Sequence, residues 1–556
     1  MKKNLNFRFL KFVENLFTDI IGLFFINKYS NFINHNRKIF NFSKLNTNRN
    51  ILIEFHNWSS LHIASSYLLK SLQKKYNANI TAYAGYPLII RPLRRNLLEK
   101  IKWYVGSFFS IKFFGVYKSI GVSKFIYPDI SEDQKKRAKL KFSSLLKKVK
   151  NNKDIENITI NNVIIGDLIY DSFLKLNSLG TINIKSKNFQ NYLNQSIQLF
   201  YFWENYFNKN NIKAVVISHS VYFLGMFARI AIKKKIKVFV CHPDYINCLN
   251  KKIPYARAEF LESKSILENI DKKLLKKGLK YTKKAISNHI AGKKIDIWWT
   301  KKSTFSEKKK YRVLNNNKKF KYLIASHSFE DSPHAYGNNL FPDNYIWLDF
   351  IGKSTTNSKH EYYIKPHPGL HKFEKENNKI ILKNIVKKYP HLILLPENVG
   401  HFQLMREGIK CVLTVIGTVG FEYPLFNIPV INASKKNSTY NFNFNIHVDK
   451  INYFKSLILE PKKIKLNINQ KEILKYYFLR HVYHPRNWLF KNIQFAEKKF
   501  GGYNDKIYNY WIQNEYSIKR DEKILNNLNK FINSNDYILD YKYSDRDILE
   551  DMKDKH

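Results

Sequence analysis

The feature that most constrains this fold is a repeated alternation of short apolar runs with helix-like segments. In the first half of the chain, an apolar run over residues 51–55 precedes a helix pattern over 59–74 and a second apolar run over 80–84. Short β-branched and aromatic runs separated by helical segments are typical of β-α-β units and of a parallel sheet. The first half is completed by expected strands at 163–165, 214–218 and 238–240 and an expected helix at 222–233.

The second half repeats this alternation more regularly. Strands are expected at 322–325, 362–364, 392–395, 412–415 and 430–431, and helices at 341–351, 373–388, 401–407, 419–426 and 470–483. We therefore predict an α/β fold with two doubly wound, Rossmann-like domains that face a central cleft. Ligands of such sheets bind beyond the carboxyl ends of the strands.

The length of 556 residues suits two or three domains at about 100–200 residues each. We expect an amphipathic helical segment over 1–45, followed by a first Rossmann-like domain with helical insertions over 46–310. The second Rossmann-like domain is expected over 311–480, and C-terminal helices with a polar tail over 481–556.

The charge is strongly basic, with 95 Lys and Arg against 44 Asp and Glu and a net charge of +51. This balance predicts attraction to nucleotides, acidic glycans or lipid headgroups. The basic residues are mostly lysines spread along the whole chain, whereas planar recognition of phosphates and bases favours arginine. We therefore expect no nucleic-acid partner, although a non-catalytic binder of anionic surfaces or nucleic acid remains the alternative from a different class.

Two further features bear on location. The three cysteines lack the spacing of a metal site or a disulfide framework, which favours a reducing compartment. No apolar run reaches the ~20 residues that span a bilayer. We expect a cytoplasmic protein that visits the inner-membrane surface. The basic and aromatic stretch 91–117 is either a membrane-facing or acceptor-facing surface or an ordinary amphipathic helix.

Two motifs in the second half point to a phosphorylated ligand. Lys365-Pro366-His367-Pro368-Gly369 follows a strand, and its prolines fix the backbone around one imidazole. A glycine turn separates a later strand from a helix and contains Gly417, Thr418, Val419, Gly420 and Glu422. Its glycines allow close approach of the backbone, Thr418 can cap the helix, and free N–H groups there attract an anion. Glu422 could accept hydrogen bonds from ribose hydroxyls or simply favour the helix start.

A third motif, over 326–337, is rich in groups that can move a proton. Glu330, Asp331 and His334 all qualify as a general base, and a purely polar loop is the alternative. The spacing of these residues does not favour a metal site, so we expect no bound metal.

Polar residues also follow strands in the first half. His56 and His219 come directly after expected strands, and Asp167 could orient an acceptor hydroxyl or act as a base. The motifs of serine hydrolases, zincins, dinucleotide enzymes and P-loop NTPases are absent from the sequence.

The segments Lys365 to Pro368, Gly417 to Glu422 and Pro429 to Ala433 resemble the bacterial capsule and surface polysaccharide biosynthesis proteins. Those are GT-B glycosyltransferases related to Kdo transferases and polysialyltransferases. The resemblance covers roughly 50–490. It departs from the polysialyltransferase acidic-acidic-Gly motif, because Ser332 follows Glu330 and Asp331.

The resemblance implies transfer of a sugar from a nucleotide-activated donor, CMP-linked in many members, to a glycan or lipid-linked acceptor, without a further cofactor. It implies that His367 contacts the nucleotide, that the glycine turn holds phosphate and that an acidic residue is the base. We expect inverting, metal-independent chemistry. A glycerophosphotransferase using CDP-glycerol is the nearest alternative, and a nucleotide-sugar 2-epimerase, which would need no acceptor, is a further one.

Overall fold

The computed structural model describes residues 29–84, 90–91, 97–291, 305, 309–367, 377–483, 488–491, 493–502, 504–540 and 543. Most of the expected N-terminal amphipathic segment, residues 1–28, lies outside the described residues, as do Pro368 and Gly369.

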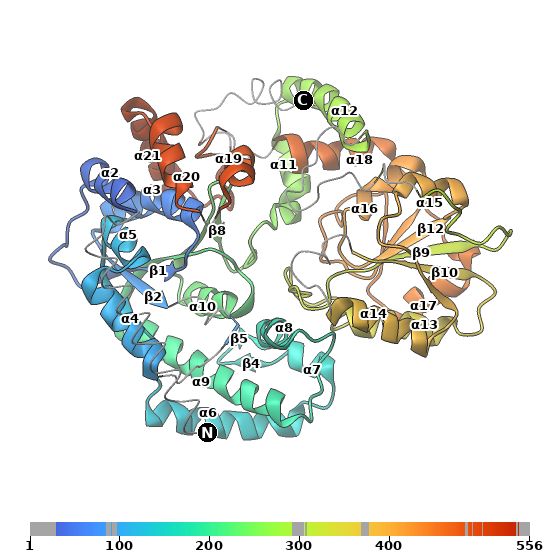
Figure 1. Cartoon of the computed structure of the whole chain (residues 1–556), viewed down its shortest axis with the longest axis horizontal. Coiled ribbons are helices and arrows are strands. Elements are labelled where there is room, and N and C mark those ends of the chain that lie inside the picture. The colour runs from blue at the N-terminus through green and yellow to red at the C-terminus, as the bar shows by residue number, and fades with distance from the viewer. Residues whose placement is uncertain are drawn as a thin grey trace. The chain divides into compact units, whose positions relative to one another are not determined.

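The chain forms two compact units, each assembled from separate stretches of sequence (Figure 1). Unit 1 comprises Met1–Ser144, Asn191–Ala256 and Pro485–Arg546, and unit 2 comprises Leu145–Gln190, Arg257–His484 and Asp547–His556. The contiguous boundaries expected from sequence, 46–310 and 311–480, therefore differ from these units. Residues 145–190 belong to unit 2, and the C-terminal helices belong to unit 1.

Unit 1 contains a six-stranded sheet in the order β3-β2-β1-β6-β7-β8. Its strands are β1 Arg49–Phe55, β2 Asn79–Ala84, β3 Val122–Ile126, β6 Asn211–Ile217, β7 Lys237–Cys241 and β8 Ile246–Leu249. All neighbours pair in parallel except β8, which runs antiparallel to β7. The strand order reverses between β1 and β6, as in a doubly wound sheet.

The expected strand at 163–165 is not part of this sheet. Val163–Ile164 is β5, which pairs with β4, Thr159–Ile160, in a small antiparallel hairpin within the part of the chain that belongs to unit 2. The assignment of this strand to the first sheet was therefore wrong. A short apolar run predicts a strand but does not reveal which strand it pairs with.

The helices of unit 1 cover both faces of its sheet. They are α2 Ser30–Phe40, α3 Ser59–Tyr76, α4 Leu97–Phe109, α5 Phe113–Ser119, α6 Glu132–Lys148, α9 Lys187–Lys209, α10 Tyr222–Lys233, α19 Ile493–Phe500, α20 Lys506–Tyr510 and α21 Ile518–Asn533. Helices α6 and α9 extend across the boundaries between the two units.

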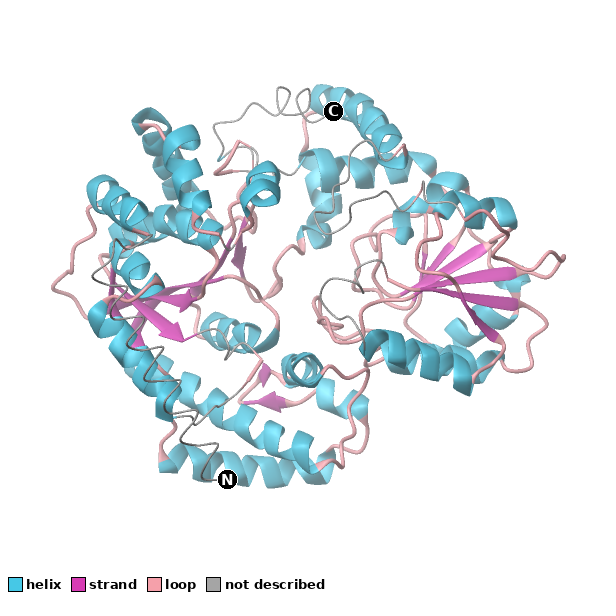
Figure 2. Cartoon of the chain, in the orientation of Figure 1, coloured by secondary structure: helices cyan, strands magenta, loops and turns pink. Residues whose placement is uncertain are grey.

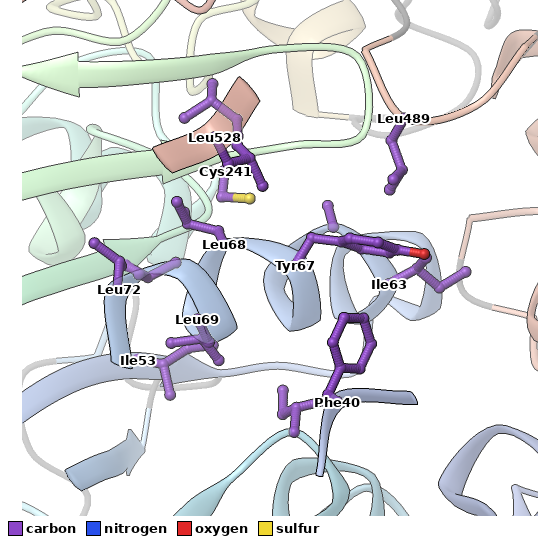
Figure 3. Packing of buried hydrophobic residues seen from close by; sticks show 14 of the residues in the cluster. Phe40, Ile53, Ile63, Tyr67, Leu68, Leu69, Leu72, Cys241, Leu489 and Leu528 are labelled. Carbon is purple, nitrogen blue, oxygen red and sulfur yellow. The ribbon is translucent and has the colours of Figure 1, made fainter. Parts of the chain in front are cut away.

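Helix α3 is the centre of this core. Every residue from Ser59 to Leu69 is buried, because α3 lies between the sheet and the C-terminal helices. Figure 3 shows Leu68, Leu69 and Leu72 of α3 between Ile53 of β1 on one side and Leu528 of α21 on the other. The C-terminal stretch thus completes the hydrophobic core of unit 1.

Unit 2 contains a second six-stranded sheet, in the order β11-β10-β9-β12-β13-β14 (Figure 2). Its strands are β9 Lys321–Ala325, β10 Glu361–Lys365, β11 Leu392–Leu394, β12 Cys411–Thr414, β13 Val430–Asn432 and β14 Ile446–His447. Every pairing is parallel, and the order reverses between β9 and β12. The predicted fold class, α/β with two doubly wound Rossmann-like sheets, is confirmed.

The helices of unit 2 connect these strands or pack beside them. They are α7 Asn152–Glu156, α8 Gly166–Asn177, α11 Ser263–Asn269, α12 Lys272–Ile290, α13 Asn344–Thr355, α14 Asn377–Lys388, α15 His401–Glu407, α16 Val419–Glu422, α17 Ile451–Leu459 and α18 Gln470–Tyr477. Gly166 starts α8 directly against α7, where a Cβ atom would lie 1.8 Å from the carbonyl oxygen of Ile155. Across the described ranges, no helix combines the length and the apolar character needed to cross a bilayer.

Candidate functional site

The strand reversal in unit 2 brings together the loops that follow β9 and β12. His327 follows β9, and its Nε2 accepts the backbone N–H groups of Val415 and Ile416, both at 3.2 Å, beyond the end of β12. The Thr414 hydroxyl lies 2.9 Å from the same nitrogen. Burial, and to a smaller extent the nearby His367, lower the pKa of His327 to about 3. The ring is therefore neutral near pH 7, with its proton on Nδ1.

His327 was not among the residues singled out from the sequence. The Ser326-His327-Ser328 segment was recognised as polar, but only the register of β9 against β12 shows that the imidazole spans two strand ends. A histidine two residues after the first strand of a doubly wound domain was the signal that could have identified it.

The glycine turn after β12 presents unused backbone donors. Within the described residues, the N–H groups of Gly417, Thr418 and Val419 donate to no acceptor, and Thr418 is exposed to solvent. A Cβ atom on Gly417 would lie 3.0 Å from Thr414 Oγ1 and 3.5 Å from His327 Cε1, so glycine keeps this corner open. Successive backbone N–H groups of this kind form a concavity suited to anions.

The rest of the turn differs from the expectation. Helix α16 spans only Val419–Glu422, and Thr418 does not cap it with its side chain. Val419 packs into the core, and the N–H of Gly420 donates to the carbonyl of Gly417 at 2.9 Å. Val419 and Gly420 therefore shape the turn, while the unused donors are concentrated over 417–419.

Glu422 points into the protein. Its Oε1 lies 3.4 Å from Nε2 of His289, and its Oε2 lies 3.5 Å from Nε2 of His401. Burial alone would raise its pKa, but hydrogen bonding by His289 and the charges of both histidines outweigh burial and lower it. This environment does not support the predicted contact between Glu422 and ribose hydroxyls.

The two polar residues of the His-Pro motif have different environments. His367 is half-buried at the end of β10, where burial lowers its pKa, Asp331 opposes that shift and Lys365 adds to it. Lys365 is buried, and its Nζ donates to the carbonyl of Val399 at 2.9 Å. His367 is thus a neutral hydrogen-bonding group, while Lys365 supplies positive charge from behind the site.

The two candidate acidic bases have different environments. Glu330 is 5% exposed, and Asp331 has a side-chain exposure of 62%. Lys175 Nζ lies 3.8 Å from Glu330 Oε1 and 3.9 Å from Asp331 Oδ1. Asp331 also interacts electrostatically with His367, and it is the more exposed of the two carboxylates.

His334 is held in the interior. Its Nδ1 lies 2.6 Å from Asp171 Oδ1, its Nε2 lies 3.1 Å from Glu156 Oε2, and the side chain is fully buried. Burial opposes protonation, but the two carboxylates outweigh it and raise the pKa of His334 to about 10. Both ring nitrogens are occupied, so the structure does not support His334 as a base. It fastens the inserted helices α7 and α8 to the rest of unit 2.

Asp167 lies in the first turn of α8 and is therefore part of unit 2, not of the expected first domain. It is buried, and its Oδ1 accepts the N–H of Leu168 at 2.9 Å. Asp167 also raises the pKa of Asp171, so it belongs to the surroundings of the His334 cluster.

In unit 1, the ends of β1 and β6 carry a chain of hydrogen bonds. The N–H and Oγ of Ser218 each donate to Glu54 Oε2 at 2.7 Å, and His219 Nδ1 lies 2.9 Å from Ser218 Oγ. Because the serine hydroxyl donates to the carboxyl group, Nδ1 of His219 is the donor in the second bond. Burial raises the pKa of Glu54 to about 7.

His56 lies among further aromatic groups at the same edge. Its ring stacks on His62 with centroids 4.8 Å apart, and its Nδ1 accepts the N–H of Trp58 at 3.2 Å. Burial holds the pKa of His56 well below its usual range, and His62, His242 and His219 lower it further. In the described part of unit 1, these side chains are not arranged as metal ligands.

Comparisons with known proteins find similar solved structures only. No protein-family model and no curated protein matches the chain. A UDP-GlcNAc 2-epimerase from Neisseria meningitidis shares 12% identity over 78% of this chain and 97% of its own, with a TM-score of 0.23. A glycosyltransferase from Rickettsia africae shares 9% identity over 84% of this chain and 100% of its own, with a TM-score of 0.23. The E. coli ADP-heptose heptosyltransferase II shares 11% identity over 72% of this chain and 90% of its own, with a TM-score of 0.19. Likenesses at this level bear on neither activity nor substrate, and the resemblance to capsule biosynthesis proteins stays a prediction.

Replacing His334 by Gln should destabilise the protein by about 3–5 kcal/mol, because Asp171 and Glu156 lose the charge that compensates them. The folded pKa of about 10 lies above the usual value of 6.5. The stabilisation is therefore full below about pH 6.5 and is lost as the pH rises through 10. Urea unfolding of both proteins between pH 6.5 and 10 should show the difference shrinking. His391→Gln is the control, because His391 bonds the Thr355 hydroxyl. A pH-independent difference would contradict the ion-pair assignment.

Replacing Ser218 by Ala should change the tautomer of His219, because the hydroxyl that accepts from Nδ1 is removed. Imidazole ¹⁵N chemical shifts report which nitrogen carries the proton. We expect an Nδ1–H signal in the parent protein and a mixture in Ser218→Ala. Ser60→Ala removes a hydroxyl bonded to Glu497 and should leave His219 unchanged. An unchanged spectrum in Ser218→Ala would refute the hydrogen-bond chain.

Proposed function

We propose that this protein is a glycosyltransferase that moves a sugar from a nucleotide-activated donor to a surface glycan or lipid-linked acceptor. One observation carries the proposal: neutral imidazoles and a run of unused backbone N–H groups occupy the carboxyl edge of the unit 2 sheet, beside the strand reversal. This is the position at which doubly wound sheets bind nucleotides.

The donor phosphate is assigned to the N–H groups of Gly417, Thr418 and Val419. Fixed donors at this point stabilise negative charge that grows as the nucleotide leaves, and they need no rearrangement to do so. His327, whose Nδ1 carries a proton, and His367 add hydrogen bonds. Lys365 contributes positive potential from its buried position.

Asp331 is assigned the role of base, because its exposed carboxylate can accept the proton of an acceptor hydroxyl. Direct attack by that hydroxyl inverts the configuration at the sugar carbon. The bond from the sugar to phosphate breaks, the bond to the acceptor oxygen forms, and the proton passes to Asp331. No metal ion takes part in these steps.

The carboxyl edge of unit 1 is assigned to the acceptor. His56 and His219 offer hydrogen bonds to hydroxyl groups there, and Trp58 offers an aromatic surface of the kind that packs against sugar rings. The chain from Glu54 through Ser218 fixes the orientation of His219.

Nucleotide binding should depend on Gly417. A thermal-shift screen with CMP, CDP, UDP and GDP should show one nucleotide family raising the melting temperature, since ligands stabilise the state they bind. Gly417→Ala should weaken that nucleotide about tenfold, because the new methyl group would lie only 3.0 Å from Thr414 Oγ1.

Gly420→Ala is the matched control, because its Cβ atom would meet no atom closer than 3.4 Å. If both variants bound the nucleotide equally weakly, or if Gly417→Ala bound it as tightly as the parent protein, the phosphate would not bind at this turn. A product containing a phosphodiester in place of a glycosidic bond would favour the glycerophosphotransferase.

Transfer should persist when EDTA is added to the purified protein with its donor and acceptor. The stabilisation of negative charge that a metal would supply is assigned here to hydrogen bonds from backbone N–H groups and His327 and to the positive charge of Lys365. Product formation is measured by mass spectrometry with and without the chelator. Loss of transfer that Mg²⁺ or Mn²⁺ restores would overturn the metal-independent mechanism.

A further inference from the structure

Helix α4 of unit 1 carries a line of large apolar side chains on its solvent side. Leu97, Ile101, Tyr104 and Phe108 are spaced i, i+4, i+7 and i+11, which places them on one face of a helix. Their exposures are 70%, 38%, 46% and 77%. We call these four residues the outer stripe. Apolar groups in contiguous, exposed rows mark surfaces that bind something.

The opposite side of α4 is fixed in the core, so the stripe cannot turn inward. Trp103 is buried, with its ring centroid 4.9 Å from that of Phe55 and 5.1 Å from that of Phe114. The Phe114 ring also packs so closely on Gly106 that a Cβ atom there would lie 2.5 Å from it. Helix α4 is therefore held with two apolar faces, one packed and one exposed.

Positive charges border the outer stripe. Lys102 and Lys112 are exposed, and Lys118 Nζ donates to the carbonyl of Phe108 at 3.2 Å and to Ser110 Oγ at 2.8 Å. The acidic groups nearby are Glu99, in the first turn of α4, and Asp129, which pairs with Lys100 at 2.6 Å. The border is therefore basic, in keeping with the net charge of +51.

We propose that the outer stripe is a docking surface for an anionic phospholipid bilayer. Leucine, isoleucine and phenylalanine enter the boundary between headgroups and acyl chains, tyrosine lies at the headgroups, and the bordering lysines contact lipid phosphates. Lipid rather than a protein partner is favoured because lysines outnumber carboxylates around the apolar row, as suits anionic headgroups. This inference does not depend on the catalytic assignments above.

The test uses the full chain and flotation with vesicles of phosphatidylcholine, with or without phosphatidylglycerol. The protein should float with anionic vesicles at low salt and bind neutral vesicles more weakly. The double variant Leu97→Asp, Phe108→Asp should lose at least about tenfold in binding, because two inserted groups are replaced by charges of the wrong sign. Leu140→Asp on α6 is the matched control, since Leu140 is 71% exposed in the same unit.

Equal flotation of the parent and the double variant would overturn the proposal. Leu140→Asp losing as much vesicle binding as the double variant would also overturn it, because the loss would then follow from the change in net charge alone. Analytical ultracentrifugation of each variant measures its oligomeric state and tests whether a second copy of the chain, rather than lipid, binds the outer stripe. If the double variant changes the oligomeric state and leaves vesicle binding unchanged, the stripe binds a second copy of the chain and the lipid assignment is wrong. Phe108→Ser alone replaces the double variant if circular dichroism shows that the latter is unfolded.

Discussion

The reversal of strand order within each sheet is the constraint on which both candidate sites depend. On either side of the reversal the crossover connections leave in opposite directions, so the ends of the two central strands are not covered by their own loops. In unit 2 this leaves the end of β12 open to His327 and to the turn at Gly417. In unit 1 it leaves the ends of β1 and β6 open to His56 and His219. The chemistry proposed for these edges uses imidazoles, and in unit 2 backbone donors, whose positions the sheet fixes.

The buried charged groups around His334 do not form a candidate site. They hold α7 and α8 against the rest of unit 2. Asp171, Glu156 and His334 compensate one another where α7 and α8 pack onto unit 2. Tyr170 of α8 also donates to Asp343, whose carboxyl group caps α13. Burial raises the pKa of Asp343 to about 6, and these hydrogen bonds favour its ionised form. A catalytic base needs an exposed lone pair, and groups with such complete partners have none to offer.

The alternation of strands and helices was predictable because it is local. The helices at 222–233 and 401–407 have the predicted bounds, and the strand at 322–325 is observed as Lys321–Ala325. The hairpin strand at 163–164 and the short β14 were assigned wrongly or missed, since two-residue strands have no periodicity to detect. Pairing between distant segments could not be read from composition either. The polar sequence after residue 500 gave no sign that Leu528 and Phe531 close the core of unit 1.

The candidate site was predicted in position more than in detail. His367 and the turn at Gly417 lie at strand ends, as their place after apolar runs indicated. The roles of Glu422 and His334 depended on partners 133 and 163 residues away in sequence, His289 and Asp171, which no local pattern reveals. His327 was overlooked because its partners are also distant in sequence: they are the backbone N–H groups of Val415 and Ile416, which follow β12.

The interleaved order of the two units has a consequence for synthesis on the ribosome. The strands and first helices of unit 1 precede residue 257, but its helices α19, α20 and α21 lie beyond residue 492 and emerge much later. Unit 2 can gather its segments earlier, because all its described strands precede residue 448. The nascent chain therefore holds an open N-terminal core, with α3 uncovered on one side, while the middle of the polypeptide folds. The core of unit 1 can close only after α19, α20 and α21 have emerged.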